Sequence, residues 1–248
     1  MSASRLTATA ARFRARWWWQ PDKWERLGTV VRLVEETDAD VRSVLDVGGR
    51  GHELHDLLPS RRVVSANVEE PCDVLLAAGP LLFDDDAFDV VTSTDVLEHM
   101  PHGQRAEHVG ELVRVARRRV VICFPSGSAT KDASEQRLAV VLAREYGVRF
   151  DFLDEHLAHG LPRAADVVSN ARAAAPWAAV HVVYQDGVDA AEQLLLDAVG
   201  AVKGRRPGAA FRSARAWLVR RRPTLTAVTS EDNSRAYVVI DLATPAPG

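Results

Sequence analysis

A short apolar strand that opens into a glycine-rich turn constrains the fold of this chain more than any other feature. Residues 43–51 read SVLDVGGRG, and a predicted helix at 52–58 follows and is closed by Pro59. Glycines in such a turn allow tight backbone conformations and a close approach of the backbone to a ligand. A strand, a glycine turn and a helix in this order predict the first βα unit of a parallel α/β domain.

Strands and helices alternate after this unit. Apolar, β-branched runs predict strands at 62–68, 88–94 and 119–124 and a weaker strand at 72–76. A helical apolar stripe at 106–116 lies before the strand at 119–124. This alternation predicts right-handed crossovers and a Rossmann-like, mostly parallel sheet with helices on both faces.

The C-terminal third is less regular. Asp132, with Glu135 three residues later, resembles a capping box and predicts a helix start. Strands predicted at 178–184 and 236–243 form the final pair of the sheet, and a helical, basic insert at 185–235 lies before the last strand.

Length and charge predict one domain with a separate arm. The chain has 248 residues and a formal net charge of −3, so we expect no nucleic-acid partner. We predict a basic, aromatic arm over 1–20 and a single domain over 21–248. The sequence has no uncharged run near the length that spans a bilayer and no secretory-signal pattern, which predicts a cytoplasmic protein.

Three ordered blocks resemble a known family. LDVGG at 45–49, FDDDAFDVVTSTDVLEH at 83–99 and RVARRRVVICFP at 114–125 resemble class I S-adenosylmethionine-dependent methyltransferases, in particular the ubiquinone/menaquinone-biosynthesis-like group. The resemblance covers roughly residues 25–160. It implies a seven-stranded sheet of order 3-2-1-4-5-7-6, with S-adenosylmethionine bound at the carboxyl ends of strands 1 and 4.

The resemblance also implies a set of cofactor-binding residues. Asp46 would organise the glycine turn, and Gly48 would lie against the methionine part of the cofactor. Thr94 and Asp95 would close the other side, near the methyl group. The full expected set is Asp46, Gly48, Gly49, Gly51, Asn67, Val68, Thr94 and Asp95.

Four positions depart from the family pattern. Arg50 and His52 stand where relatives usually have glycines, and Asn67 replaces the acid that holds the ribose hydroxyls. Ala77 replaces an acid on the adenine side. Arg50, His52 and Asn67 do not fit the usual NAD-binding pattern. Asn67 and Ala77 favour one alternative: a non-catalytic scaffold, or a membrane-associated partner, whose cofactor site has decayed.

Candidate catalytic residues follow strand 88–94 and recur in DEHLAHGLP at 154–162. Methyl transfer is an in-line displacement, and a general base is needed when the acceptor is a hydroxyl. We expect the catalytic residues to be Asp95, His99 and His156, with His159 as a further substrate-contact residue. The alternatives are a helix-capping role for His99 and exposed loop positions for the other two histidines.

A metal site is the remaining chemical alternative. Asp95, Glu98 and His99 resemble the metal site of small-RNA 3′-end methyltransferases, with His156 as a further ligand. DVLEH also occurs in relatives that are not associated with a metal, so we predict no metal.

Two features bear on the acceptor. The residues Trp17–Trp19 and the basic stretch 203–222 suit a polar–apolar boundary and anionic headgroups. A chain with both features suits a membrane-bound glycolipid or prenyl-type acceptor and peripheral membrane contact. The activity that we predict is O-methylation of a small-molecule, glycan or lipid-linked acceptor. A solvated helix face, with the tryptophans packed as a lid or in a dimer contact, is the alternative.

Overall fold

The computed structural model describes residues 21–37, 40–77, 79–186, 190–206, 208, 225–230 and 233–242. Its strands are β1 (Ser43–Val47), β2 (Arg62–Asn67), β3 (Val74–Leu75), β4 (Phe88–Thr94), β5 (Ala116–Pro125), β6 (Ala179–Asp186), β7 (Leu225–Thr226) and β8 (Asn233–Asp241). Its helices are α2 (Pro21–Glu35), α3 (Glu53–Leu57), α4 (Arg105–Val115), α5 (Ala129–Val141), α6 (Asp151–His159), α7 (Ala164–Ala174) and α8 (Ala190–Val202). Short helical turns are η1 (Leu97–His99), η2 (His102–Gln104) and η3 (Leu142–Tyr146).

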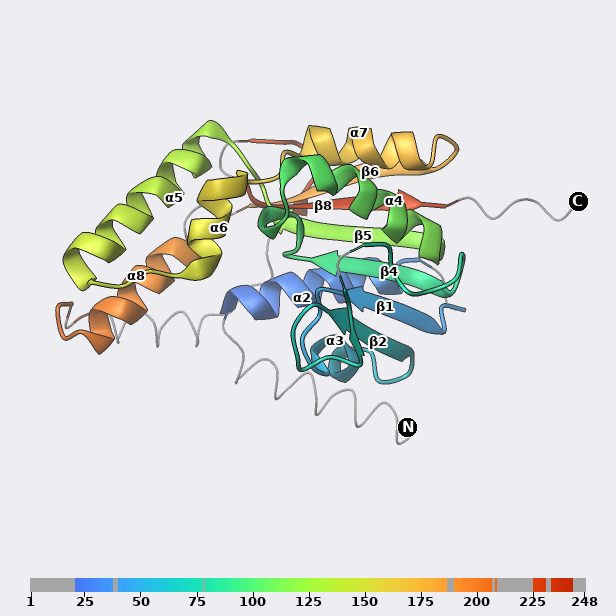
Figure 1. Cartoon of the computed structure of the whole chain (residues 1–248), viewed down its shortest axis with the longest axis horizontal. Coiled ribbons are helices and arrows are strands. Elements are labelled where there is room, and N and C mark those ends of the chain that lie inside the picture. Colours follow the sequence, from blue (N-terminus) through green and yellow to red (C-terminus); the bar gives the residue numbers. More distant parts are fainter. Residues whose placement is uncertain are drawn as a thin grey trace, which may run out of the picture.

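One sheet contains all of these strands, in the order β3-β2-β1-β4-β5-β8-β6-β7 (Figure 1). The strands from β3 to β5 pair in parallel, and β8 lies antiparallel between β5 and β6. The predicted strand order is therefore confirmed, with the candidates at 178–184 and 236–243 as β6 and β8. The two-residue β7 is an additional edge strand that the prediction of seven strands lacked.

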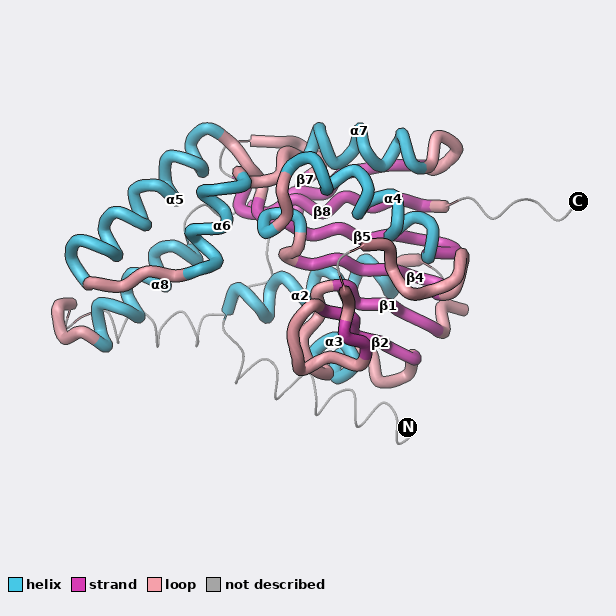
Figure 2. Tube along the Cα trace, in the orientation of Figure 1, coloured by secondary structure: helices cyan, strands magenta, loops and turns pink. Residues whose placement is uncertain are grey.

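Helices cover both faces of the sheet, as predicted (Figure 2). Side chains of a strand point alternately to its two faces, so neighbouring residues of β1 enter different cores. Leu45 lies in a core with Leu112 of α4 and Val167 of α7. Val44 lies in a second core with Val30 of α2 and Leu54 of α3. The apolar run of β1 is thus buried on both sides, which explains why it has no polar alternation.

A helical layer formed by α5, η3, α6 and α8 lies beyond the sheet, at the end toward which the β4 arrow points (Figure 1). Its own core contains Leu138, Leu142, Tyr146 and Leu153. Because α6 packs on η1, which follows β4, this layer borders the carboxyl ends of the central strands.

The start of α5 corrects the predicted capping box. The N-cap is Ser128, whose hydroxyl accepts a hydrogen bond from the Lys131 backbone N–H at 3.1 Å. Asp132 instead pairs with Arg163, and Glu135 is buried beside His156. The prediction was wrong because tertiary partners take both acids, while an upstream serine caps the helix.

The arm 1–20, with Trp17–Trp19, and residues 209–224 of the predicted basic insert lie outside the described residues. Within the described part of the basic insert, Arg205 and Arg206 lie over the Tyr146 ring, each 5.9 Å from its centroid. These two cations therefore pack against the helical layer. None of the described helices combines the length and the apolar composition that a membrane-spanning helix needs.

Candidate functional site

A cleft of about 980 Å³ opens where β1, β2 and β4 end. This is the position that a parallel α/β sheet provides at its switch in strand order. The expected cofactor-binding residues line the cleft, with the exception of Gly51, as do Ala77 and the catalytic candidates Asp95 and His99. His156 is buried on α6 and is not part of the cleft wall.

Packing within the protein requires the first two glycines of the turn. Gly48 has a φ of 82°, and a Cβ there would lie 2.2 Å from Val96 Cγ2. A Cβ on Gly49 would lie 2.1 Å from the Asp46 carboxylate. The turn therefore packs closely against the ends of β1 and β4. Arg50 and His52, two of the departures from the family pattern, are exposed and leave this packing intact.

Asp46 lies under the turn with its carboxyl group buried. Burial raises its pKa to about 7, although Thr92 Oγ1 donates a hydrogen bond to it at 2.8 Å. The neighbouring charge of Glu53 contributes to this rise. Asp46 therefore titrates near neutral pH.

The amide of Asn67 is used within the protein. Its Nδ2 donates to the carbonyls of Gly48 and Gly49 at 3.2 and 3.4 Å, and its Oδ1 accepts from the Val68 N–H at 2.7 Å. A carboxylate has no hydrogen to donate to those carbonyls. This departure from the family pattern therefore holds the glycine turn against the end of β2.

Asp95 is held in a charge network that the sequence analysis missed. It has a φ of 53°, and its Oδ2 lies 2.5 Å from Arg26 of α2. Its Oδ1 accepts from Arg235 of β8, which also reaches Asp22 at 3.3 Å. The two arginines occupy both oxygens of the carboxylate. The sequence carries only a weak indication of this network, because each arginine is a charged residue next to an apolar run, in α2 and at the start of β8.

Two buried polar atoms of cleft-lining residues have no hydrogen-bond partner among the described residues. They are Thr94 Oγ1 and Arg26 Nε. A buried polar group without a partner is costly, so such groups mark positions where a ligand completes the bonding. Both fit a polar ligand such as an amino-acid moiety.

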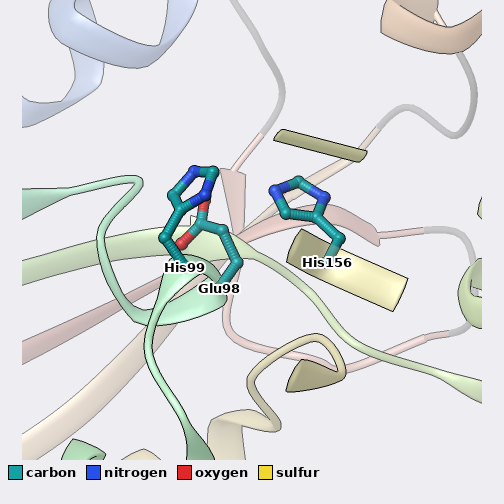
Figure 3. Close-up of side chains that lie close together, drawn as sticks. All are labelled: Glu98, His99 and His156. Carbon is teal, nitrogen blue, oxygen red and sulfur yellow. The ribbon is translucent and has the colours of Figure 1, made fainter. Parts of the chain in front are cut away.

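The structure brings Glu98, His99 and His156 together (Figure 3). A ligand-capable atom from each residue lies within 4.8 Å of the others. Glu98 is buried, and burial raises the pKa of its carboxyl well above the usual range, helped by the negative charge of Asp95. Asp95, which the sequence offered as a possible metal ligand, is not part of this cluster, and neither is His159, which was expected as a substrate contact.

His108 is a cleft residue that the sequence analysis did not single out. Its Nε2 lies 3.3 Å from Ser93 Oγ, and burial lowers its pKa to about 4. It therefore presents a neutral imidazole to the cleft at physiological pH. Its place on a helix between charged residues carried no signal for this role.

No family model matches the chain, and no curated protein matches it by sequence. Solved structures do match. A SAM-dependent methyltransferase from Thermotoga maritima has 9% identity and a TM-score of 0.55, with 96% of this chain and 98% of that chain covered. A SAM-dependent methyltransferase from Archaeoglobus fulgidus has 9% identity and a TM-score of 0.54, with 93% and 98% covered.

The chain therefore has the fold of the class I SAM-dependent methyltransferases. This agrees with the resemblance carried by its sequence blocks. The ubiquinone-biosynthesis-like subgroup stays a prediction.

Proposed function

We propose that this protein is an S-adenosylmethionine-dependent methyltransferase that binds its cofactor in the cleft at the ends of β1, β2 and β4. The observation that carries the proposal is the cleft itself. It lies at the switch in strand order and is lined by the expected residues other than Gly51, among them Thr94, whose hydroxyl has no hydrogen-bond partner in the described part of the chain. Its volume of about 980 Å³ is large enough for a cofactor together with a small acceptor group.

The residues present fit the cofactor. Arg26 offers a guanidinium for the methionine carboxylate, and Thr94 offers a hydroxyl beside it. Val68 is 68% exposed at the cleft wall, and with Leu76 it provides apolar surface for the adenine. Asn67 acts by holding the glycine turn, and Glu69 at the mouth is paired with Arg50 at 2.6 Å.

When bound, the cofactor supplies an electrophilic methyl group on a sulfonium. The chain orients the two reactants in line and excludes water, which provides much of the acceleration for such a displacement. His99, Met100, Phe152 and Glu155 line the end of the cleft beside η1 and α6, where we place the acceptor.

A hydroxyl acceptor must also lose a proton. His99 lines the cleft, and its Nδ1 lies 2.5 Å from Glu155 Oε2, which leaves Nε2 to accept a proton. Asp95 is held by two arginines, so we assign it a positioning role. His156 lies behind the cleft wall and acts through its neighbours.

We infer O-methylation of a small-molecule, glycan or lipid-linked acceptor. The exposed Phe152 and half-buried Met100 suit an apolar part of such a molecule, and His99 suits its hydroxyl. The membrane contact predicted for Trp17–Trp19 and for 203–222 remains a prediction. The internal use of the Asn67 amide is the observation that favours the scaffold alternative.

Transfer of a labelled methyl group from S-adenosylmethionine tests the proposal. Hydroxyl-bearing small molecules, glycans and polyprenyl lipids are each assayed beside the same molecule with its hydroxyl already methylated. We expect transfer only to a free hydroxyl, and a loss of about 10²-fold in His99→Asn, in line with general-base contributions. His102→Asn, an exposed histidine outside the cleft, is the matched control. Label incorporation into no acceptor, or into the methylated analogue, would contradict O-methylation.

A further inference from the structure

A carboxylate and two imidazoles from different parts of the fold meet behind the end of the cleft. Glu98 and His99 lie on η1, directly after β4, and His156 lies on α6. Figure 3 shows the His156 ring turned toward His99 and the Glu98 carboxylate. The rings of His99 and His156 are 5.1 Å apart between centroids.

A carboxylate contacts the Nδ1 of each ring and fixes the orientation of that ring. His99 Nδ1 lies 2.5 Å from Glu155 Oε2, and His156 Nδ1 lies 3.3 Å from Glu135 Oε1. An imidazole that donates its Nδ1 proton to a carboxylate keeps a lone pair on Nε2. This carboxylate–histidine arrangement is the usual second layer around metal-bound histidines.

The third member has an unfilled bonding position. Glu98 is 1% exposed, and its Oε2 has no hydrogen-bond partner among the described residues. A buried carboxylate oxygen without a donor is costly, and a cation would satisfy it. This observation is independent of the spacing of the three side chains.

We propose that Glu98, His99 and His156 bind one divalent first-row transition-metal ion. One carboxylate and two imidazoles suit ions such as Zn²⁺, Fe²⁺ or Mn²⁺ better than Mg²⁺ or Ca²⁺, which prefer oxygen ligands alone. Ligands around such an ion lie about 3.5 Å apart, and the three candidate atoms already lie within 4.8 Å of one another, so small side-chain rotations bring them to that distance. The proposal reverses the sequence prediction that no metal is bound.

The ion would lie at the edge of the cleft, because His99 is both a member of the cluster and part of the cleft wall. Three protein ligands leave at least one coordination position for water or for an oxygen of the acceptor. A hydroxyl bound there would lose its proton more readily, since a coordinated cation stabilises the alkoxide. In the metal-loaded protein His99 is then a ligand, and the ion replaces it as the group that activates the hydroxyl.

The test is metal binding by the purified full chain, without cofactor, after treatment with a chelator. Zn²⁺ is titrated by calorimetry, and Co²⁺ by its visible absorption. We expect one equivalent of each ion, and an affinity at least 100-fold lower in Glu98→Gln and in His156→Gln. Glu135→Gln, which removes a second-layer carboxylate, should lower the affinity by about 10- to 100-fold. His159→Gln, on the same helix but outside the cluster, should bind like the wild type.

Absence of saturable Zn²⁺ and Co²⁺ binding in the wild type would overturn the proposal. Binding that is unchanged in both Glu98→Gln and His156→Gln would also overturn it. Circular dichroism and S-adenosylhomocysteine binding show whether each variant is folded. Because cofactor binding is measured separately on metal-free protein, failure of the metal site is distinguishable from failure of the proposed methyltransferase function.

Discussion

The guanidinium of Arg235 on β8 is bonded to the carboxylate of Asp95, which lies 140 residues earlier at the end of β4. The register of the sheet produces this contact, because β8 pairs antiparallel with β5 and places Arg235 opposite Pro125. Arg26 holds the other oxygen of Asp95 at 2.5 Å. One ionic network thus joins α2, β4 and β8 along one wall of the cleft.

The first prediction concerns this network. Arg235→Gln leaves the Asp95 carboxylate with one of its two cationic partners, in a site where Arg235 is only 10% exposed. We expect a loss of about 3 kcal/mol in the free energy of unfolding, measured with urea. Arg149→Gln breaks an exposed pair with Asp154 and should cost under about 0.5 kcal/mol.

A double-mutant cycle of Arg235→Gln with Asp95→Asn isolates the pair. The expected coupling energy is on the order of 1–3 kcal/mol. Strictly additive effects would show that the two side chains do not stabilise each other.

The second prediction concerns the pH dependence of stability at Asp46. Its pKa is about 7 in the folded protein against an ordinary value of 3.8, because burial disfavours the charged form. The stability that the protonated carboxyl confers is fully present below pH 3.8 and is lost as the pH rises through about 7. As the pH rises from 4 to 8, the free energy of unfolding of Asp46→Asn, measured with urea, should therefore increase by on the order of 3 kcal/mol relative to that of the wild type.

Asp73→Asn is the control for that experiment. Its carboxylate accepts hydrogen bonds from Ser65, which hold its pKa below the usual range. The free energy of unfolding of Asp73→Asn relative to that of the wild type should therefore decrease as the pH rises. An Asp46→Asn variant whose stability relative to the wild type is independent of pH would contradict the burial of a titrating carboxyl.

The third prediction distinguishes two roles of Asn67. If this amide were a weakened ribose ligand, Asn67→Asp would restore the family residue and raise the affinity for S-adenosylhomocysteine. Its bonds to the carbonyls of Gly48 and Gly49 predict the reverse, because a carboxylate cannot donate to them. We expect a lower affinity by calorimetry and about 2 kcal/mol of lost stability. A higher affinity in the variant would assign Asn67 to the ribose.

The strands and the two-sided core could be predicted from the sequence because their signal is local. In the strand 43–47 the apolar residues fall on both faces, which indicates burial on both sides, and the resemblance of the sequence blocks implied the strand order. The glycine turn was likewise predictable, since the positive φ at position 48 favours glycine over residues with a side chain.

The contacts that define the site could not be predicted in this way. The pairing of Asp95 with Arg235 depends on the register of β8, and the meeting of His99 with His156 depends on how α6 packs on η1. Such contacts join distant residues and leave no periodic signal. The wrong cap of α5 has the same origin, because Asp132 pairs with Arg163 instead of capping the helix.

The central claim is that the cleft binds the cofactor, and calorimetric titration with S-adenosylhomocysteine tests it most directly. The wild type is compared with Val68→Arg, which places a long cation at the cleft wall, and with Val228→Arg, an equally exposed valine outside the cleft. We predict one site of micromolar affinity in the wild type and in Val228→Arg, and at least 100-fold weaker binding in Val68→Arg. No detectable binding to the wild type at millimolar ligand, or equal binding in the three proteins, would contradict the account.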